Sequence, residues 1–126
     1  MVSWLQILPL QKKLFSIGKM FKEYKDFDAT GLANLIEKKE ISPKELLDEA
    51  IFQTETIDPL INAIPQRHFE LAKEQLDTNL SGPFYGVPFL LKDLHASLKG
   101  TITSDGSRLH RKNIAKYTDT LTQRCL

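Results

Sequence analysis

A run of large apolar residues near position 90 constrains the fold of this chain more than any other feature. It reads Gly86-Val87-Pro88-Phe89-Leu90-Leu91-Lys92-Asp93-Leu94, and no polar residue interrupts it between positions 87 and 91. A run without polar alternation is typical of a strand buried on both faces of a sheet. Because helical patterns precede this predicted strand, the sequence favours an α/β domain.

The clearest helix start lies at Ser42, 44 residues before this run. The hydroxyl of Ser42 can accept a hydrogen bond from the backbone N–H of Glu45, and the Glu45 carboxylate can bond back to the N–H of Ser42. Pro43 fits the first helical position, where its missing N–H costs nothing. We expect this helix to end at Asp58-Pro59, because the residue before a proline is biased away from the helical region.

Two further helices flank this one. Asp28 or Thr30 can cap an earlier helix that carries Leu32, Leu35 and Ile36. After a short extended piece at 61–64, a later helix has three apolar residues on one side: Phe69, Ala72 and Leu76.

Residues 1–25 differ from the rest of the chain in charge. They hold five lysines and one glutamate, whereas the whole chain has 17 Lys and Arg against 16 Asp and Glu. Apolar residues between positions 10 and 24 recur at helical spacing, which predicts a basic amphipathic helix. Such a helix binds a membrane surface or a partner protein, or packs on its own domain. We therefore expect a helix within 1–25 and a separate domain over 26–126.

No part of the sequence has the pattern of a membrane or export segment. The apolar runs fall short of the roughly 18 residues that span a bilayer. No positive charge precedes an apolar core at the N-terminus, as a secretory signal requires. The single cysteine, Cys125, cannot form an intramolecular disulfide, which favours a reducing compartment. The sequence thus predicts a cytoplasmic protein without a transmembrane segment.

The sequence also predicts neither a nucleic-acid partner nor a metal or cofactor. A formal net charge of +1 creates no strong field for nucleic acid. His68, His95 and His110 are too far apart for a local metal-ligand pair. The patterns G-x-x-x-x-G-K-[ST], G-x-G-x-x-G and G-x-S-x-G are absent.

Lys92 is the residue whose position raises a chemical question. An ammonium group at the end of a buried strand must reach solvent, pair with a carboxylate such as Asp93, or lose its proton. Burial can lower the pKa of a lysine from ~10.4 by as much as ~3–5 units, and a neutral lysine is a general base. The residues alone favour solvent or a carboxylate partner, because lysines are almost never buried unpaired.

The segment 100–107 is rich in glycine and in hydroxyl side chains. It is predicted to be a connecting loop, since such clusters usually connect elements. The alternative is a turn that presents backbone N–H groups and hydroxyls beside a site.

Several segments together resemble the amino-terminal part of the amidase signature family. Their order and spacing match over about residues 26–124, and the segments are Phe27-Asp28-Ala29-Thr30-Gly31-Leu32-Ala33, Ile41-Ser42-Pro43-Lys44-Glu45-Leu46, Ile61-Asn62-Ala63, 82–94, 103–109 and 118–124. The family usually has threonine or alanine where Ser104 and Asp105 stand. The form of residues 86–94 is most similar to bacterial amidases related to the nylon-oligomer cyclic dimer hydrolase.

This resemblance implies a hydrolase of carbon–nitrogen bonds in carboxamides. Its members use a Ser-Ser-Lys triad, in which Lys92 matches the lysine that relays a proton through a bridging serine to the nucleophilic serine. A hydroxyl nucleophile needs such an adjacent base. The fold implied is a mixed sheet flanked by helices, and the substrate implied is a small-molecule amide.

The same resemblance implies that the site is incomplete. Both triad serines lie in a Gly- and Ser-rich signature that these 126 residues do not contain, and Ser104 and Ser107 match the segment before it. We therefore expect a truncated amidase domain that is inactive alone, with a complementing C-terminal chain as a further possibility. The alternative is a noncatalytic module that binds a membrane or a partner protein through its basic N-terminal helix.

Overall fold

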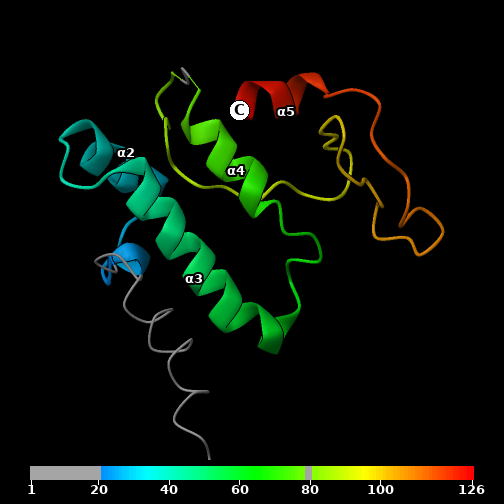
Figure 1. Cartoon of the computed structure of the whole chain (residues 1–126), viewed down its shortest axis with the longest axis horizontal. Helices are drawn as coiled ribbons and strands as arrows, with labels where there is room; N and C mark the ends of the chain where they lie inside the picture. The colour runs from blue at the N-terminus through cyan, green and yellow to red at the C-terminus, as the bar shows by residue number, and fades with distance from the viewer. Residues whose placement is uncertain (1–20, 79–80) are drawn as a thin grey trace, which may run out of the picture. The chain divides into compact units, whose positions relative to one another are not determined.

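The computed structural model describes residues 21–78 and 81–126 (Figure 1). In these ranges the chain forms a 3-10 turn, η2 (Tyr24–Asp26), and the α-helices α2 (Ala29–Glu37), α3 (Pro43–Ile61), α4 (Phe69–Leu76) and α5 (Thr120–Cys125). They fall into two compact units. The described residues up to Ala63, with Phe69–Val87, make the first unit, and Ile64–His68, with Pro88–Leu126, make the second.

The predicted helix starts at Asp28 and Ser42 are confirmed. The Asp28 carboxylate accepts a hydrogen bond of 2.7 Å from the backbone N–H of Gly31, so Asp28 rather than Thr30 caps α2. Ser42 and Glu45 form the complete capping box at the start of α3, with Pro43 as the first helical residue. These bonds satisfy N–H groups that the first turn of a helix leaves without partners.

The predicted end of α3 at Asp58-Pro59 is wrong. The helix continues through Pro59 to Ile61, and Asn62 then leaves it in the left-handed region with φ of 50°. Proline removes only one backbone donor in a last turn, and Asp58 supplies other bonds there. Its carbonyl accepts from the N–H of Asn62 at 2.6 Å and its carboxylate accepts from the N–H of Ala63 at 2.7 Å. The piece at 61–64 therefore begins with the last residue of α3 and a left-handed Asn62, followed by residues without regular secondary structure.

The first unit has a small apolar core where α2 meets α3. Leu32, Ile41 and Leu46 are buried, and partly buried apolar residues pack around them: Phe21, Tyr24, Leu35, Ile36 and Val87. Gly86 allows the chain to approach α3 closely, because a Cβ atom there would lie 2.7 Å from Cγ of Pro43. The apolar run of the sequence thus begins against this core at Val87.

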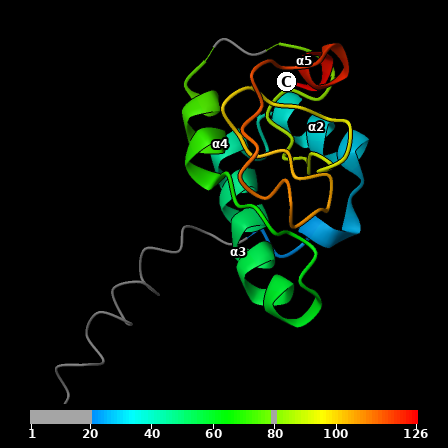
Figure 2. The ribbon, with the colours of Figure 1, turned by 90° about the vertical axis from the view of Figure 1, so that its right-hand side faces the viewer.

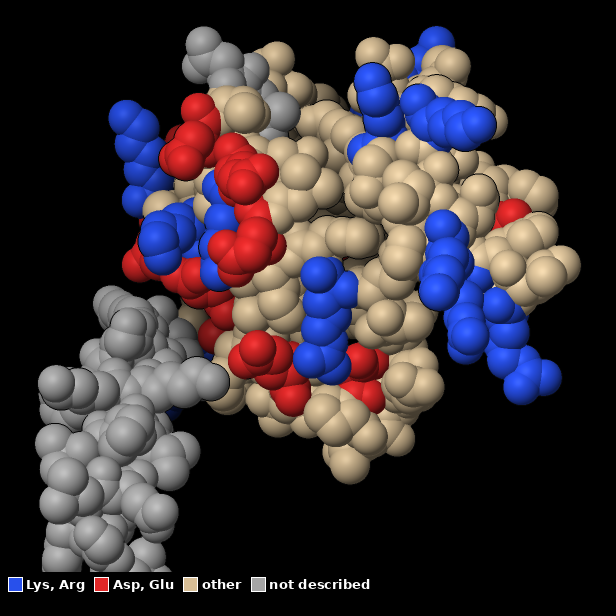
Figure 3. All heavy atoms as spheres, turned by 45° about the vertical axis from the view of Figure 1, so that its right-hand side comes forward, with Lys and Arg blue, Asp and Glu red and all other residues tan. Residues whose placement is uncertain are grey.

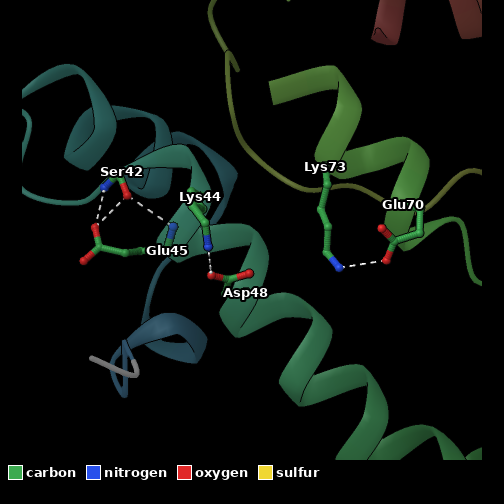
Figure 4. A network of polar contacts seen from close by, with 6 residues as sticks. All are labelled: Ser42, Lys44, Glu45, Asp48, Glu70 and Lys73. Carbon is green, nitrogen blue, oxygen red and sulfur yellow. Dashed lines mark hydrogen bonds and ion pairs between the residues drawn. The ribbon is translucent and has the colours of Figure 1, made fainter. Parts of the chain in front are cut away.

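Helix α4 packs beside α3 in the same unit, as Figures 1 and 2 both show. It covers Phe69–Leu76, so the predicted helix with Phe69, Ala72 and Leu76 is confirmed. Two exposed ion pairs lie on these helices (Figure 4). Lys44 Nζ is 2.6 Å from Oδ2 of Asp48 on α3, and Lys73 Nζ is 2.8 Å from Oε1 of Glu70 on α4. Exposed pairs of this kind are screened by water and stabilise little.

The predicted mixed sheet is wrong for the part of the chain that the structure describes. It contains no strand there, and its only bridge is an isolated antiparallel one between Ile102 and Ile114. Residues 88–91 run without regular structure, and the side chains of Phe89 and Leu90 are 50% and 73% exposed. A strand depends on a neighbouring strand to bond its N–H and C=O groups, whereas a helix bonds within itself. The apolar run has no such neighbour among the described residues, so it forms no strand.

The second unit is held by two segments that face each other around this bridge. The N–H of Thr103 donates to the carbonyl of Asn113, and the N–H of Ala115 donates to that of Thr101, both at 2.9 Å. Nearer the ends of these segments, the Asp119 carboxylate accepts a bond of 2.6 Å from the N–H of Ser97. Asp119 also caps α5, since its carboxylate accepts a bond of 2.8 Å from the N–H of Thr122.

The predicted basic helix between positions 10 and 24 lies mostly outside the described residues. Its described end is a turn that leads into η2 at Tyr24. The division of the chain at residue 25 therefore stays a prediction. None of the helices in 21–78 and 81–126 has the length and apolarity needed to cross a membrane.

Candidate functional site

Lys92 follows the apolar run and lies in the second unit. Its side chain is exposed, and no hydrogen bond or ion pair engages its ammonium group in the part of the chain that the structure describes. Desolvation of this amine, one of the three alternatives drawn from the residues, is not found in the described structure, where the predicted strand before it does not form. Of the alternatives drawn from the residues, access to solvent is the one that the structure shows.

The carboxylate of Asp93 is engaged elsewhere in the unit. Its Oδ1 accepts from the backbone N–H of Ser104 at 2.7 Å and from that of Asp105 at 3.4 Å. Its Oδ2 accepts from the Ser104 hydroxyl and, at 3.3 Å, from the side-chain amide of Gln66. Four donors from two other segments therefore converge on the residue next to Lys92.

These donors determine the charge state of Asp93. Burial by itself would raise the pKa of Asp93, but the hydrogen bonds from Ser104, Asp105 and Gln66 favour the ionised form and outweigh it. The net effect holds the pKa of Asp93 below its ordinary value of 3.8. Asp93 is thus a carboxylate with its acceptor positions occupied.

The hydroxyl-rich segment 100–107 supplies most of these donors. The sequence predicts a connecting loop here, with a turn that presents N–H groups and hydroxyls beside a site as the alternative, and that role stays a prediction. The segment has no regular secondary structure, and in it Ser104 and Asp105 donate hydrogen bonds to Asp93. Ser107 makes a local contact instead, since its Oγ accepts from the N–H of Leu109 at 3.2 Å. Sequence reasoning missed the role of Asp93, because its donors lie 11 to 27 residues away along the chain and no local pattern signals them.

A hollow on the second unit does not include Lys92 in its lining. It is open to solvent, has a volume of about 650 Å³, and its lining includes His95, Asn113, Tyr117 and Asp119. Hydrogen bonds from the N–H groups of Thr122 and Ser97 hold the pKa of Asp119 below 3.8. Asp119 therefore contributes a negative charge to this hollow, whose lining also includes Lys116 and apolar residues such as Ile114.

A second hollow of about 420 Å³ lies between α3 and α4 in the first unit. It is lined by both polar and apolar residues, including Leu47, Lys73, Leu76 and Tyr85. The hydrogen bond with Glu70 raises the pKa of Lys73 above its ordinary value of 10.5. No residue singled out from the sequence as catalytic borders this hollow.

The three histidines are not gathered into a metal site by the described structure. Across residues 21–78 and 81–126, no group of three or more His, Cys, Asp and Glu side chains is arranged to hold a metal ion. Acidic and basic side chains both reach the face shown in Figure 3. The prediction of no metal, cofactor or nucleic-acid partner stays a prediction.

Comparison with known proteins indicates the class of protein to which the relatives of this chain belong. The chain is 43% identical over 77 residues to 6-aminohexanoate-cyclic-dimer hydrolase from Pseudomonas sp. strain NK87, a match covering 61% of this chain and 15% of the relative. It is 33% identical over 115 residues to a lipoamidase from Enterococcus faecalis, covering 88% of this chain and 16% of the relative. It is 34% identical over 95 residues to an acylamidase from Rhodococcus erythropolis, covering 69% of this chain and 20% of the relative.

These relatives are enzymes that act on carbon–nitrogen bonds. More particularly, the homologues of this chain are members of the amidase signature family, which confirms the resemblance drawn from its residues. The chain spans only 15% to 20% of the length of these three relatives. No family model matches the chain, and no solved structure matches it. Neither the comparisons nor the described contacts support the alternative of a membrane- or partner-binding module.

Proposed function

We propose that this chain is the lysine-bearing part of a Ser-Ser-Lys amidase that hydrolyses small carboxamides, and that it is inactive without the two serines. The observation that carries the proposal is the match to lipoamidase. A match over 88% of a 126-residue chain necessarily includes its central positions, and Lys92 is among them. The family resemblance then assigns Lys92 the role of the base that activates a serine.

The exposed amine of Lys92 defines what the rest of the enzyme must supply. Removing water from an amine, or placing a positive charge beside it, favours the neutral form, which is the form that acts as a base. Exposed apolar side chains stand next to it, with Phe89 at 50%, Leu90 at 73% and Leu94 at 41% exposure. Covering these side chains would remove water from the amine as well. We propose that the serine-bearing part of the amidase, in the same polypeptide or in a complementing C-terminal chain, covers them.

The first experiment uses the 126-residue chain by itself. We expect no turnover of simple carboxamides, because a lysine cannot perform acyl transfer without a nucleophile. Robust turnover that is lost in Lys92→Ala would contradict the proposal, since it would place the nucleophile within these residues.

A chimaera tests the lysine directly. In it, this chain replaces the matching segment of 6-aminohexanoate-cyclic-dimer hydrolase, whose remaining residues supply the serines. We expect the chimaera to hydrolyse the cyclic dimer, Lys92→Ala to remove that activity, and the matched control Lys99→Ala to leave it unchanged. A folded chimaera whose activity survives Lys92→Ala would overturn the assignment of the base.

The DNA beyond the codon for Leu126 separates the two sources of the serines. A continuing or adjacent reading frame that encodes glycine-flanked serines would identify the rest of the amidase. Unrelated sequence there would contradict a nearby complementing chain. The free thiol of the exposed Cys125 supports a cytoplasmic location, which fractionation of cells that express the tagged chain would test.

A further inference from the structure

We propose that Asp93 is a positioning residue for Lys92, because its hydrogen bonds to Gln66, Ser104 and Asp105 keep its carboxylate away from the neighbouring ammonium group. The inference rests on the proposed function only in giving Lys92 the role of a base. Its structural content, a carboxylate withheld from the adjacent lysine, is testable in the chain by itself.

Asp93 directly follows Lys92 in the sequence, so its carboxylate must be held away if the lysine is to act as a base. A carboxylate next to an ammonium group stabilises the charged amine and opposes loss of its proton. A general base must be free of its proton for part of the time near the working pH. A Lys-Asp pair in sequence therefore works against catalysis by the lysine unless the carboxylate is held elsewhere.

The geometry shows how the carboxylate is held. Both of its oxygens are occupied, Oδ1 by two backbone N–H groups and Oδ2 by the Ser104 hydroxyl and the Gln66 amide. The two donors on Oδ2 are side chains, so substitution can remove them while the backbone bonds remain. Lys92, by contrast, has no bonded partner within the residues described.

The side-chain amide of Gln66 makes a hydrogen bond to Asp93 on one side only. Its Nε2 donates to Asp93, while its Oε1 is buried without a hydrogen-bond partner among the residues placed in the structure. A buried acceptor without a partner costs free energy, so the contact with Asp93 is one that the fold retains despite that cost.

The test measures how fast Lys92 reacts with limiting acetic anhydride at one fixed pH, by peptide mass spectrometry, with exposed Lys99 as the internal reference. Only a neutral amine reacts, so the rate reports ion pairing of Lys92. In the wild-type chain we expect the two lysines to react at similar rates. The double variant Gln66→Ala with Ser104→Ala frees Oδ2 to pair with Lys92 and should slow its acetylation about two- to five-fold, the range of an exposed ion pair.

Controls separate this effect from a general loss of structure. The matched double variant Gln75→Ala with Ser107→Ala removes the same side chains where neither contacts Asp93, and it should leave the rate unchanged. Adding Asp93→Asn to the first double variant should restore the wild-type rate, which a merely structural role of the cluster would not do. Circular dichroism and amide NMR spectra establish that each variant is folded.

Three results would overturn the proposal. They are faster acetylation of Lys92 in Asp93→Asn alone, an unchanged rate in the folded double variant, and a wild-type Lys92 that reacts several-fold more slowly than Lys99. The last needs no substitution and decides the matter even if the variants fail to fold.

In the chimaera, loss of activity in Lys92→Ala but not in the double variant would support the amidase function and reject positioning. Activity that survives Lys92→Ala would reject the function and leave the acetylation results standing.

Discussion

Ser42 and Glu45 form reciprocal hydrogen bonds at the start of α3. The Ser42 backbone N–H and hydroxyl donate to Oε2 of Glu45 at 2.9 Å and 2.7 Å, and the Ser42 hydroxyl accepts from the Glu45 N–H at 3.2 Å (Figure 4). The helix that they begin carries Leu46, whose side chain is completely buried in the core of the first unit. The cap therefore fixes where the core-forming face of α3 starts.

Loss of this cap should destabilise the first unit. We expect Ser42→Ala to lower the free energy of unfolding by about 1 kcal/mol, the usual cost of an N-cap hydroxyl. Urea unfolding followed by circular dichroism measures the change. Ser42→Asp, which keeps an acceptor for the Glu45 N–H, is the matched control and should lose much less. Equal losses in both variants would show that the cap is not the source of the effect.

Acid should destabilise the second unit through two aspartates. The pKa values of Asp93 and Asp119 lie below 3.8 in the folded chain, because donors around each favour its charged form. Their contribution is fully present above the unfolded value and is lost as the pH falls through the folded values. We expect the urea concentration at half-unfolding to decrease as the pH is lowered below about 4. The decrease should be smaller in Asp119→Asn. A midpoint independent of pH in this range would contradict the prediction.

A buried glutamate should perturb a tyrosine in the first unit. Burial raises the pKa of Tyr24 above 10.0, and the negative charge of Glu49 raises it further. Glu49 is only 3% exposed, so water screens its charge weakly. We expect Glu49→Gln to lower the pKa of Tyr24, measured by phenolate absorbance, while burial keeps it above 10.0. Tyr24→Phe identifies the transition, and an unchanged pKa in Glu49→Gln would contradict the coupling.

Substitution of Gly86 should separate backbone strain from steric overlap. Its φ of 74° lies in the left-handed region, and an added Cβ would stand 2.7 Å from Cγ of Pro43. Gly100 has a φ of 85° and open space around it. We expect Gly100→Ala to cost about 1–2 kcal/mol from the backbone alone, and Gly86→Ala to cost more. Equal costs, measured by urea unfolding, would show that Pro43 moves aside freely.

The helices were predictable because their signals are local. Ser42, Pro43 and Glu45 lie within one turn, and Asp28 reaches the N–H of Gly31 across three residues. The end of α3 was not predictable from Pro59, because Asp58 also bonds the backbone beyond it. Lys92 was singled out by its place after an apolar run, and the matches to amidases support the family that this run and the other matching segments together suggested.

The amino-acid sequence by itself determined the helix starts, which depend on residues close together along the chain, and the family resemblance, which depends on the order and spacing of its segments. Only the tertiary structure decided that residues 88–91 form no strand, that Lys92 is exposed and that Asp93 is bound by Gln66 and Ser104. A strand and a bound carboxylate both require groups from distant segments, and no local pattern states whether those groups arrive. The physical reason is that a helix satisfies its own backbone, whereas an extended segment and a charged side chain depend on the rest of the fold.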